Sequence, residues 1–148
     1  MGRNTHTILH ICLTCQIAGE APGTDTDSTI ETNSGSDEET DGARLLAAVK
    51  RAIDAADAPL PIIVNPVACM ANCEQGCTAA LSMPGKWSYI VGKLTDAEAE
   101  ALVDYATIYA ASKSGVIMPS KRSPALRDVV IARLPAHPDD IAANEDIR

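Results

Sequence analysis

Five cysteines in two short groups are the residues of this chain best suited to chemistry. Cys12 and Cys15 form a Cys-x-x-Cys pair near the N-terminus, and Cys69, Cys73 and Cys77 follow at intervals of four. Thiolates bind soft metals and iron–sulfur clusters, and two nearby thiols can also form a reversible disulfide. Five cysteines, with no apolar stretch ahead of them that would predict a secretory signal, do not favour structural disulfides. The pattern therefore predicts a metal centre or a redox-active thiol pair.

The second group favours a metal centre, because a thiol oxidoreductase needs only two cysteines. A [2Fe–2S] cluster takes four thiolates and tolerates varied spacing, so five cysteines would supply four ligands and one spare. Zinc ribbons usually separate their cysteine pairs by about 15–20 residues, whereas residues 16–68 lie between the two groups here. Zinc is the alternative metal. Five small apolar core residues are the simplest alternative interpretation, because unmodified cysteine is often buried.

Histidines flank the first cysteine pair. His10 precedes Cys12 by two residues, so on a strand the two side chains would share a face. A mixed His/Cys site is therefore conceivable, although a histidine packed on the strand or exposed to solvent is the preferred interpretation. His6 is a weaker candidate, and His137 lies between prolines and is expected to be solvated.

Three short segments are typical of strands, and a cysteine group lies at or soon after the end of two of them. Thr7–Cys12 is apolar and β-branched, and Ile62–Val64 is wholly apolar, as in a strand buried between covering layers. Lys86–Val91 is expected to form a third strand that ends at Gly92. This arrangement would position both cysteine groups where a strand gives way to a loop.

Three helices are expected around these strands. The first helix is predicted over about residues 43–56, with Asp41 as its cap. The second helix follows a capping box formed by Thr95 to Glu98 and runs to about Ala111. Ser123 and Pro124 are predicted to open a short third helix. Apolar residues recur on one side of each helix, at Leu45, Val49 and Ile53, at Leu102, Ala106 and Tyr109, and at Leu126, Val130 and Leu134.

The net charge of −8 arises from one segment. Residues 20–41 hold eight acids and no Lys or Arg, so the rest of the chain is neutral overall. Residues 19–41 are rich in Gly, Ser, Thr and acids, which predicts a flexible acidic insertion. The chain has neither a basic stripe nor more than four aromatic residues, which argues against a nucleic-acid partner. No apolar run is long enough to predict a membrane helix.

Several motifs together resemble a known group of proteins. They are Cys12-Leu-Thr-Cys15, Cys69-Met-Ala-Asn-Cys73-Glu-Gln-Gly-Cys77, Gly85-Lys-Trp-Ser-Tyr-Ile-Val-Gly92, Ala125-Leu-Arg127 and Ala132-Arg-Leu-Pro135. The chain resembles the uncharacterised predicted metal-binding proteins encoded beside cobalamin-biosynthesis genes, which are similar to thioredoxin-like [2Fe–2S] ferredoxins. The resemblance covers most of the chain outside residues 19–41 and the last ten.

The order of the expected strands and helices indicates a single small α/β domain over residues 1–138, with a small mixed sheet flanked by helices, and residues 139–148 are expected to form a flexible tail. The resemblance implies that this domain has a thioredoxin-like fold. It implies a ferredoxin-like electron-transport protein with a [2Fe–2S] cluster on Cys12, Cys15, Cys69 and Cys73, near cobalamin metabolism. In those ferredoxins the first two cysteines are usually farther apart. Cys77 is an extra thiol that could replace Cys15.

Three functions are weighed against one another. The first is a [2Fe–2S] electron carrier that docks to a redox partner protein. The second is a thioredoxin-like thiol oxidoreductase using Cys12 and Cys15. The third is a protein that stores or delivers zinc or another metal. The sequence shows no plausible Ser/His/Asp arrangement and no phosphate loop, so no motif predicts an enzyme of another class. We expect a cytoplasmic protein without a membrane or nucleic-acid partner, and a second copy of the chain is a further candidate partner.

Overall fold

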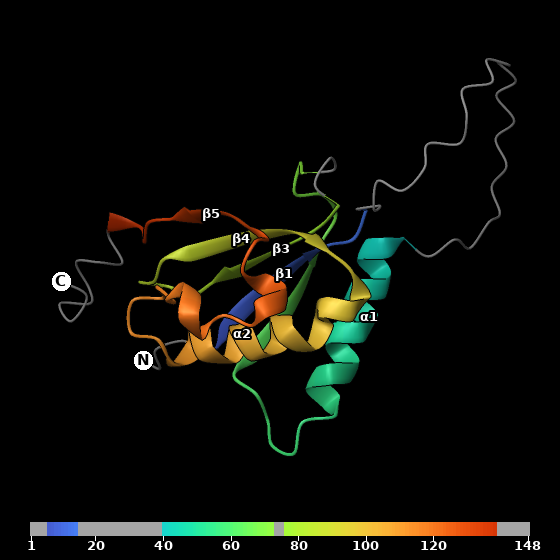
Figure 1. The fold of residues 1–148 in the computed structure, drawn as a ribbon, viewed down its shortest axis with the longest axis horizontal. Helices are drawn as coiled ribbons and strands as arrows, with labels where there is room; N and C mark the ends of the chain where they lie inside the picture. Colours follow the sequence, from blue (N-terminus) through green and yellow to red (C-terminus); the bar gives the residue numbers. More distant parts are fainter. Residues whose placement is uncertain (1–5, 15–39, 73–75, 139–148) are drawn as a thin grey trace, which may run out of the picture.

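The structure is a computed structural model that describes residues 6–14, 40–72 and 76–138 (Figure 1). Its strands are β1 (Thr7–Cys12), β2 (Ile62–Val67), β3 (Cys77–Ser82), β4 (Ser88–Leu94) and β5 (Val130–Leu134). Its helices are α1 (Asp41–Asp54) and α2 (Ala99–Ala111), with single 3₁₀ turns at Asp96–Glu98, Pro119–Lys121 and Pro124–Leu126. No helix in these three ranges is long and apolar enough to cross a membrane.

The five strands form one mixed sheet in the order β2-β1-β3-β4-β5. β1 and β2 are parallel and are joined through α1, whereas β3, β4 and β5 each run antiparallel to the neighbour before them. A β-α-β unit followed by a β-hairpin and a helix is the arrangement expected of a small thioredoxin-like α/β domain. The predicted fold class is confirmed.

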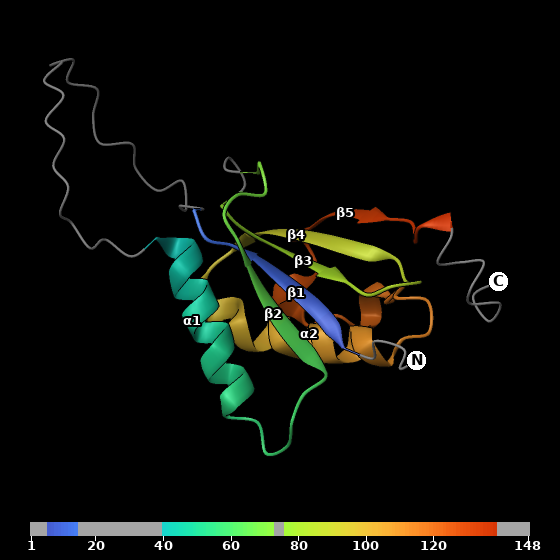
Figure 2. The same ribbon diagram turned by 180° about the vertical axis from the view of Figure 1, so that it is seen from behind.

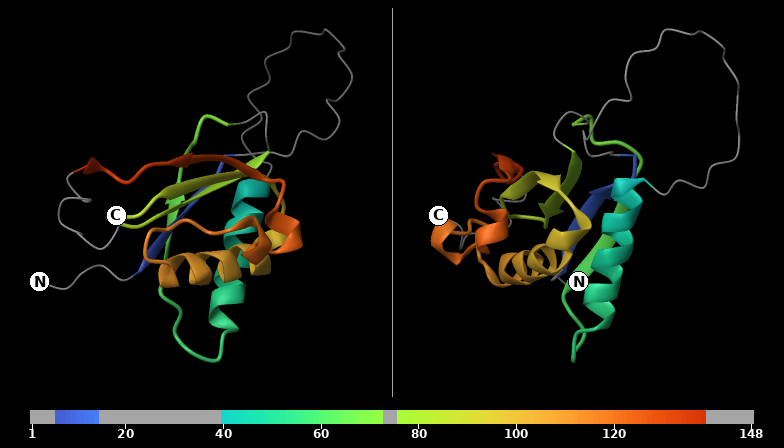
Figure 3. Two further views of the ribbon diagram at one scale, coloured as in Figure 1. Left: turned by 60° about the vertical axis from the view of Figure 1, so that its left-hand side comes forward. Right: turned by 45° about the vertical axis from the view of Figure 1, so that its right-hand side comes forward.

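Both helices pack on the same face of the sheet (Figure 3). Leu9 and Ile11 of β1 are fully buried beneath them, as are Leu45 and Val49 of α1. On the α2 side the core contains three buried tyrosines, in which the Tyr89 ring packs edge-on against Tyr105 at 5.7 Å and Tyr109 at 6.4 Å. The core therefore lies between the sheet and one helical layer, and no helix among the described residues covers the other face of the sheet.

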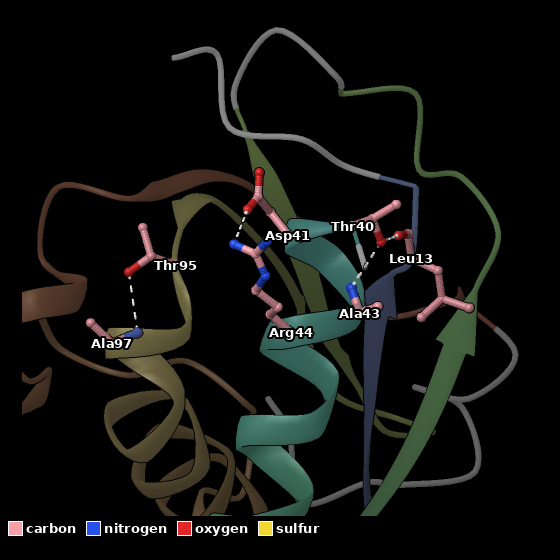
Figure 4. Close-up of polar contacts among 7 residues, drawn as sticks. All are labelled: Leu13, Thr40, Asp41, Ala43, Arg44, Thr95 and Ala97. Atoms are coloured by element: carbon pink, nitrogen blue, oxygen red, sulfur yellow. Dashed lines mark hydrogen bonds and ion pairs between the residues drawn. The ribbon is translucent and has the colours of Figure 1, made fainter. Parts of the chain in front are cut away.

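Helix α1 begins two residues earlier than its sequence pattern predicts. Thr40, rather than Asp41, is the N-cap, because its hydroxyl oxygen accepts a hydrogen bond from Ala43 N at 3.1 Å (Figure 4). Asp41 is the first helical residue, and its carboxylate pairs with Arg44 at 3.4 Å. The predicted acidic insertion at 19–41 therefore overlaps the described helix at its last residue, and its stretch 19–39 lies outside the described residues.

Two predictions about the strands on either side of the cysteine groups are wrong. β2 is an edge strand with Ile63 47% exposed, not a strand buried between two layers. Pro66 explains this position, because proline has no N–H for a second neighbouring strand. β4 continues through Gly92 to Leu94, and the missing side chain makes room for Ile131 of β5, whose Cδ1 would lie 2.5 Å from a Cβ there.

The C-terminal helix predicted from Ser123 is also wrong. Only one 3₁₀ turn forms there, and Val130–Leu134 forms the edge strand β5. The i, i+4, i+8 spacing suggested a helix, but the β-branched run from Val129 to Ile131 favours extended backbone. The predictions for β1 and for α2 up to Ala111 are confirmed, including the capping box between Thr95 and Glu98.

Candidate metal centre

The cysteines within the described residues gather at one end of the sheet. Because β1 and β2 are parallel, their carboxyl ends lie at the same edge, and the antiparallel β3 begins there (Figure 2). Cys12 is the last residue of β1, Cys69 follows β2 by two residues, and Cys77 is the first residue of β3. Cys77 therefore belongs to a strand, whereas Cys69 lies in the loop that follows β2.

Hydrogen bonds join the loop after Cys12 to the loop before Cys69. Leu13 N donates to Val67 O at 2.8 Å, and the Thr14 hydroxyl donates to Ala68 O at 2.7 Å. The Cys12 sulfur lies 4.0 Å from the same Ala68 oxygen. The two cysteine-bearing segments, far apart in sequence, are thus tied together by backbone contacts that do not depend on a bound metal.

The N-terminus of α1 packs against the first of these segments. A Cβ on Gly42 would lie 2.1 Å from Cys12 O, so only glycine allows this approach. The Thr40 hydroxyl, which caps α1, also donates to Leu13 O (Figure 4). The first turn of α1 is therefore held next to the Cys12–Leu13 backbone.

Cys69 is exposed, and its sulfur accepts a hydrogen bond from the backbone N–H of Ala71 at 3.3 Å. Ala71 adopts a left-handed conformation with φ 56°, which costs a residue with a Cβ about 1–2 kcal/mol. The loop is held in place at Asn72, whose side-chain amide donates to the buried Thr78 hydroxyl at 3.0 Å. A strained residue that directs a donor at an exposed sulfur is typical of a functional loop.

Cys12 and Cys77 are both buried, with exposed fractions of 1% and 0%. Their positions differ, however. Cys12 ends its strand beside the polar atoms of the joined loops, with its sulfur 3.9 Å from the Thr14 hydroxyl. Cys77 pairs with Leu94 in the β3–β4 ladder and is enclosed by apolar core. The surroundings of Cys77 are those of a core thiol.

The predicted ligands Cys15 and Cys73 lie outside the described residues, so the full ligand set stays a prediction. Within the described ranges, no group of three or more His, Cys, Asp or Glu side chains could hold a metal ion. The donors that are present nevertheless fit an iron–sulfur group in kind. They are sulfur atoms on two hydrogen-bonded segments, with a backbone N–H directed at one of them.

His10 is not placed as a metal ligand. Its Nδ1 faces the Asn65 side-chain nitrogen at 2.9 Å and its Nε2 faces the Ser82 hydroxyl at 2.8 Å, so both ring nitrogens already have protein partners. Because the Asn65 amide donates, Nδ1 is the acceptor and Nε2–H donates to Ser82. Burial lowers the pKa of His10 below its ordinary value, which favours this neutral form. His10 is the strand-packed histidine that the sequence favours.

A comparison with protein families matches residues 9–136 of the chain to DUF1636, described as a protein of unknown function. The chain belongs to the DUF1636 family. The match contains all five cysteines and every strand and helix except the first two residues of β1. No curated protein and no solved structure matched the chain.

Sequence reasoning missed several residues that shape this end of the DUF1636 domain. Thr14, Thr40 and Gly42 hold α1 and the second cysteine segment against Cys12, and Ala71 supplies the N–H to Cys69. A glycine in the first turn of a predicted helix is a usable signal of close approach. Ala71 offers no such signal, because alanine does not indicate a left-handed conformation.

Proposed function

We propose that this DUF1636 protein is a small cytoplasmic electron carrier that binds a [2Fe–2S] cluster through Cys12, Cys15, Cys69 and Cys73. One observation carries the proposal. The segments that bear the two cysteine groups are hydrogen-bonded to each other at the carboxyl ends of adjacent parallel strands. Four thiolates from two such segments are the donor set of a [2Fe–2S] cluster.

The cluster, when bound, would supply a one-electron couple. The protein's own groups would set the surroundings of the sulfur ligands. The Ala71 N–H, which donates to the Cys69 sulfur, would reduce the charge density on that ligand. Hydrogen bonds to sulfur and solvent exposure are the means by which a protein tunes the reduction potential of such a centre.

Cys15 is the better candidate for the fourth ligand, and Cys77 the better candidate for the spare thiol. The Cys77 side chain is 0% exposed and is enclosed by apolar residues of the core. A ligand there would draw the metal away from the joined loops and toward the helical layer. Cys15, by contrast, follows Thr14, whose hydroxyl is already bound to the second cysteine segment.

Cys69 is the one described cysteine exposed to solvent, which supports electron transfer through a docked protein at this end of the sheet. A redox partner would approach the loops that contain Cys69 and Met70, both of which are more accessible than Cys12. We therefore propose a redox partner protein rather than a small-molecule substrate, and no nucleic-acid or membrane partner.

A thiol oxidoreductase acting through Cys12 and Cys15 is the alternative. A disulfide-exchanging thiolate must be reached by its substrate, and Cys12 is 1% exposed. Cys15 would then have to be the attacking residue. A site for zinc, used in storage or delivery, is a third candidate, because the same thiolates bind zinc.

The test is anaerobic purification of the full chain, followed by visible absorption and measurement of iron, acid-labile sulfide and zinc. We expect a brown protein with bands in roughly the 400–600 nm region. Cys12→Ser, Cys69→Ser and Cys73→Ser should each abolish iron and sulfide retention. Cys15→Ser should do the same, whereas Cys77→Ser is the matched control that keeps both.

The outcomes separate the candidates. A colourless protein with one equivalent of zinc would identify a zinc site and overturn the proposal. A metal-free protein that alkylates rapidly at Cys15 and reduces insulin disulfides would identify the oxidoreductase. Normal iron content in Cys73→Ser would overturn the ligand assignment.

A further inference from the structure

One face of the sheet carries both helices, and the opposite face, called the open face here, carries none among the described residues. Strand register places Ile8, Ile63, Ile90 and Leu134 on the open face, each on a different strand. Ile63 is 47% and Leu134 50% exposed, although both are large and apolar. An exposed sheet face of this kind usually carries polar and charged side chains.

In the part of the chain that the structure describes, the two rows of residues that cross the whole open face include no charged side chain. Two rows of residues cross all five strands there, one running from Ile63 to Leu134 and the other from Asn65 to Ala132. Neither row contains Lys, Arg, Asp or Glu. Charged residues are 22% of the chain, so their absence from a solvent-facing surface calls for a physical reason. A surface that is covered in the working protein supplies one.

The histidine at the centre of the open face is hydrogen-bonded to polar neighbours on the same face. His10 lies at the centre and hydrogen-bonds Asn65 on one side and Ser82 on the other, at 2.9 and 2.8 Å. Such internal pairing reduces the cost of removing polar groups from water, because no donor or acceptor of the imidazole is left unpaired. The histidine, like the apolar side chains around it, is suited to burial.

The open face is large enough for a weak, concentration-dependent interface. Strands about 4.8 Å apart, with six residues rising about 3.3 Å each, give five strands a footprint of about 24 Å by about 20 Å, or about 480 Å². Two such faces would bury about 960 Å² in total, which is at the lower end of the areas found in specific protein–protein interfaces.

The remaining parts of this chain are poor occupants for an uncharged surface. Residues 15–39 contain seven acids and no base, and residues 139–148 contain four acids and one arginine. Burying them against the open face would desolvate carboxylates with no cation to pair with. A second copy of the chain presents the same uncharged surface, which is complementary to itself about a two-fold axis.

We propose that two copies of this chain associate through their open faces, sheet against sheet. The proposal rests on the uncharged face and the His10 hydrogen bonds and is independent of the proposed [2Fe–2S] cluster. Two sheets packed in this way lie about 10 Å apart, with the apolar side chains of each filling the layer between them.

The test is sedimentation equilibrium of the full chain over a concentration series. We expect twice the monomer mass of 15.5 kDa. Ile63→Lys and Leu134→Lys introduce a charge on the open face at half-exposed positions, and each should raise the dimer dissociation constant at least about tenfold. Met118→Lys and Ile108→Lys are matched controls, because these residues are 60% and 38% exposed but lie away from the open face. The controls should stay dimeric.

A second measurement needs no variant. In a mixture of isotope-labelled and unlabelled chains, filtered NOEs should connect the Ile63 and Leu134 methyl groups to the other copy. A wild-type monomer at every concentration would overturn the proposal, as would equal effects of the face and control variants. A monomer with NOEs from these methyls to residues 139–148 would assign the face to the tail instead. A complex with a different protein and no self-association would also overturn it.

Discussion

Ala71 keeps its backbone in the left-handed region so that its N–H reaches the Cys69 sulfur. Replacing Ala71 with glycine removes the steric cost of the Cβ but leaves the N–H in place. We expect Ala71→Gly to raise the free energy of unfolding by about 1 kcal/mol, measured by urea denaturation. Ala47→Gly, in the interior of α1, is the matched control and should lower the free energy by about 1 kcal/mol.

His10 gives stability a pH dependence whose sign follows from its burial. Burial lowers the pKa of His10 below 6.5 in the folded protein, so the unfolded chain binds this proton more readily. Stability is therefore complete above pH 6.5 and falls as the pH decreases toward the lowered pKa. The neighbouring strands place only uncharged groups, Asn65 and Ser82, against the ring.

We expect His10→Gln to flatten the decrease in the free energy of unfolding between about pH 7 and pH 5. Urea titrations of both proteins across this range measure the difference between their slopes. An unchanged slope in His10→Gln would contradict the assigned cause.

At the scale of elements, α1 is fixed to β1 through its first turn. The Thr40 hydroxyl accepts from Ala43 N and donates to Leu13 O, so one side chain both caps the helix and holds the cysteine segment. We expect Thr40→Ala to lower the free energy of unfolding by about 1 kcal/mol, measured by thermal or urea denaturation.

Thr107→Ala provides the comparison for this prediction. The Thr107 hydroxyl bonds only to Val103 O of its own helix, at 2.9 Å. Its removal should therefore change stability by less than about 0.5 kcal/mol. Equal effects of the two substitutions would show that the Thr40 contacts contribute nothing beyond helix propensity.

The elements predicted correctly are those whose signals are local. The apolar, β-branched run in Thr7–Cys12 and the capping box at Thr95 are complete within a few residues, and both elements appear where expected. The strand β3 was not anticipated, because five of the six residues of Cys77–Ser82 are small and its position in the centre of the sheet depends on distant partners. The sequence predicts that two cysteine groups lie near strand ends. It does not predict the hydrogen bonds that join the two cysteine-bearing segments.

At the scale of the whole molecule, we expect the fold to persist without the acidic residues 20–39. The described contacts that fix α1 involve Thr40, Asp41 and Gly42, so a deletion must stop before Thr40. Replacing residues 20–39 with a short Gly/Ser bridge removes seven acids and no base. The entropy cost of closing a loop depends only weakly on the length of the loop, so shortening this one should change the free energy of unfolding little.

We expect this deletion to leave the melting temperature and any bound iron unchanged. Association with a basic redox partner should become slower and less dependent on salt, because long-range attraction is lost. Calorimetry, iron analysis and stopped-flow kinetics at two salt concentrations measure these effects. A deletion extended through Asp41 is the informative contrast and should destabilise the protein.

The contact between Gly42 and the Cys12 carbonyl limits how this sequence can evolve. With β1 and α1 in place, any side chain at position 42 would meet backbone oxygen at 2.1 Å, so selection should retain glycine there. The number of residues between the two elements is under no such constraint. Among DUF1636 members we therefore expect insertions and deletions ahead of α1 to accumulate freely, while a glycine persists as its second residue. That glycine, rather than any count of residues, would then mark the start of the first helix in diverged chains.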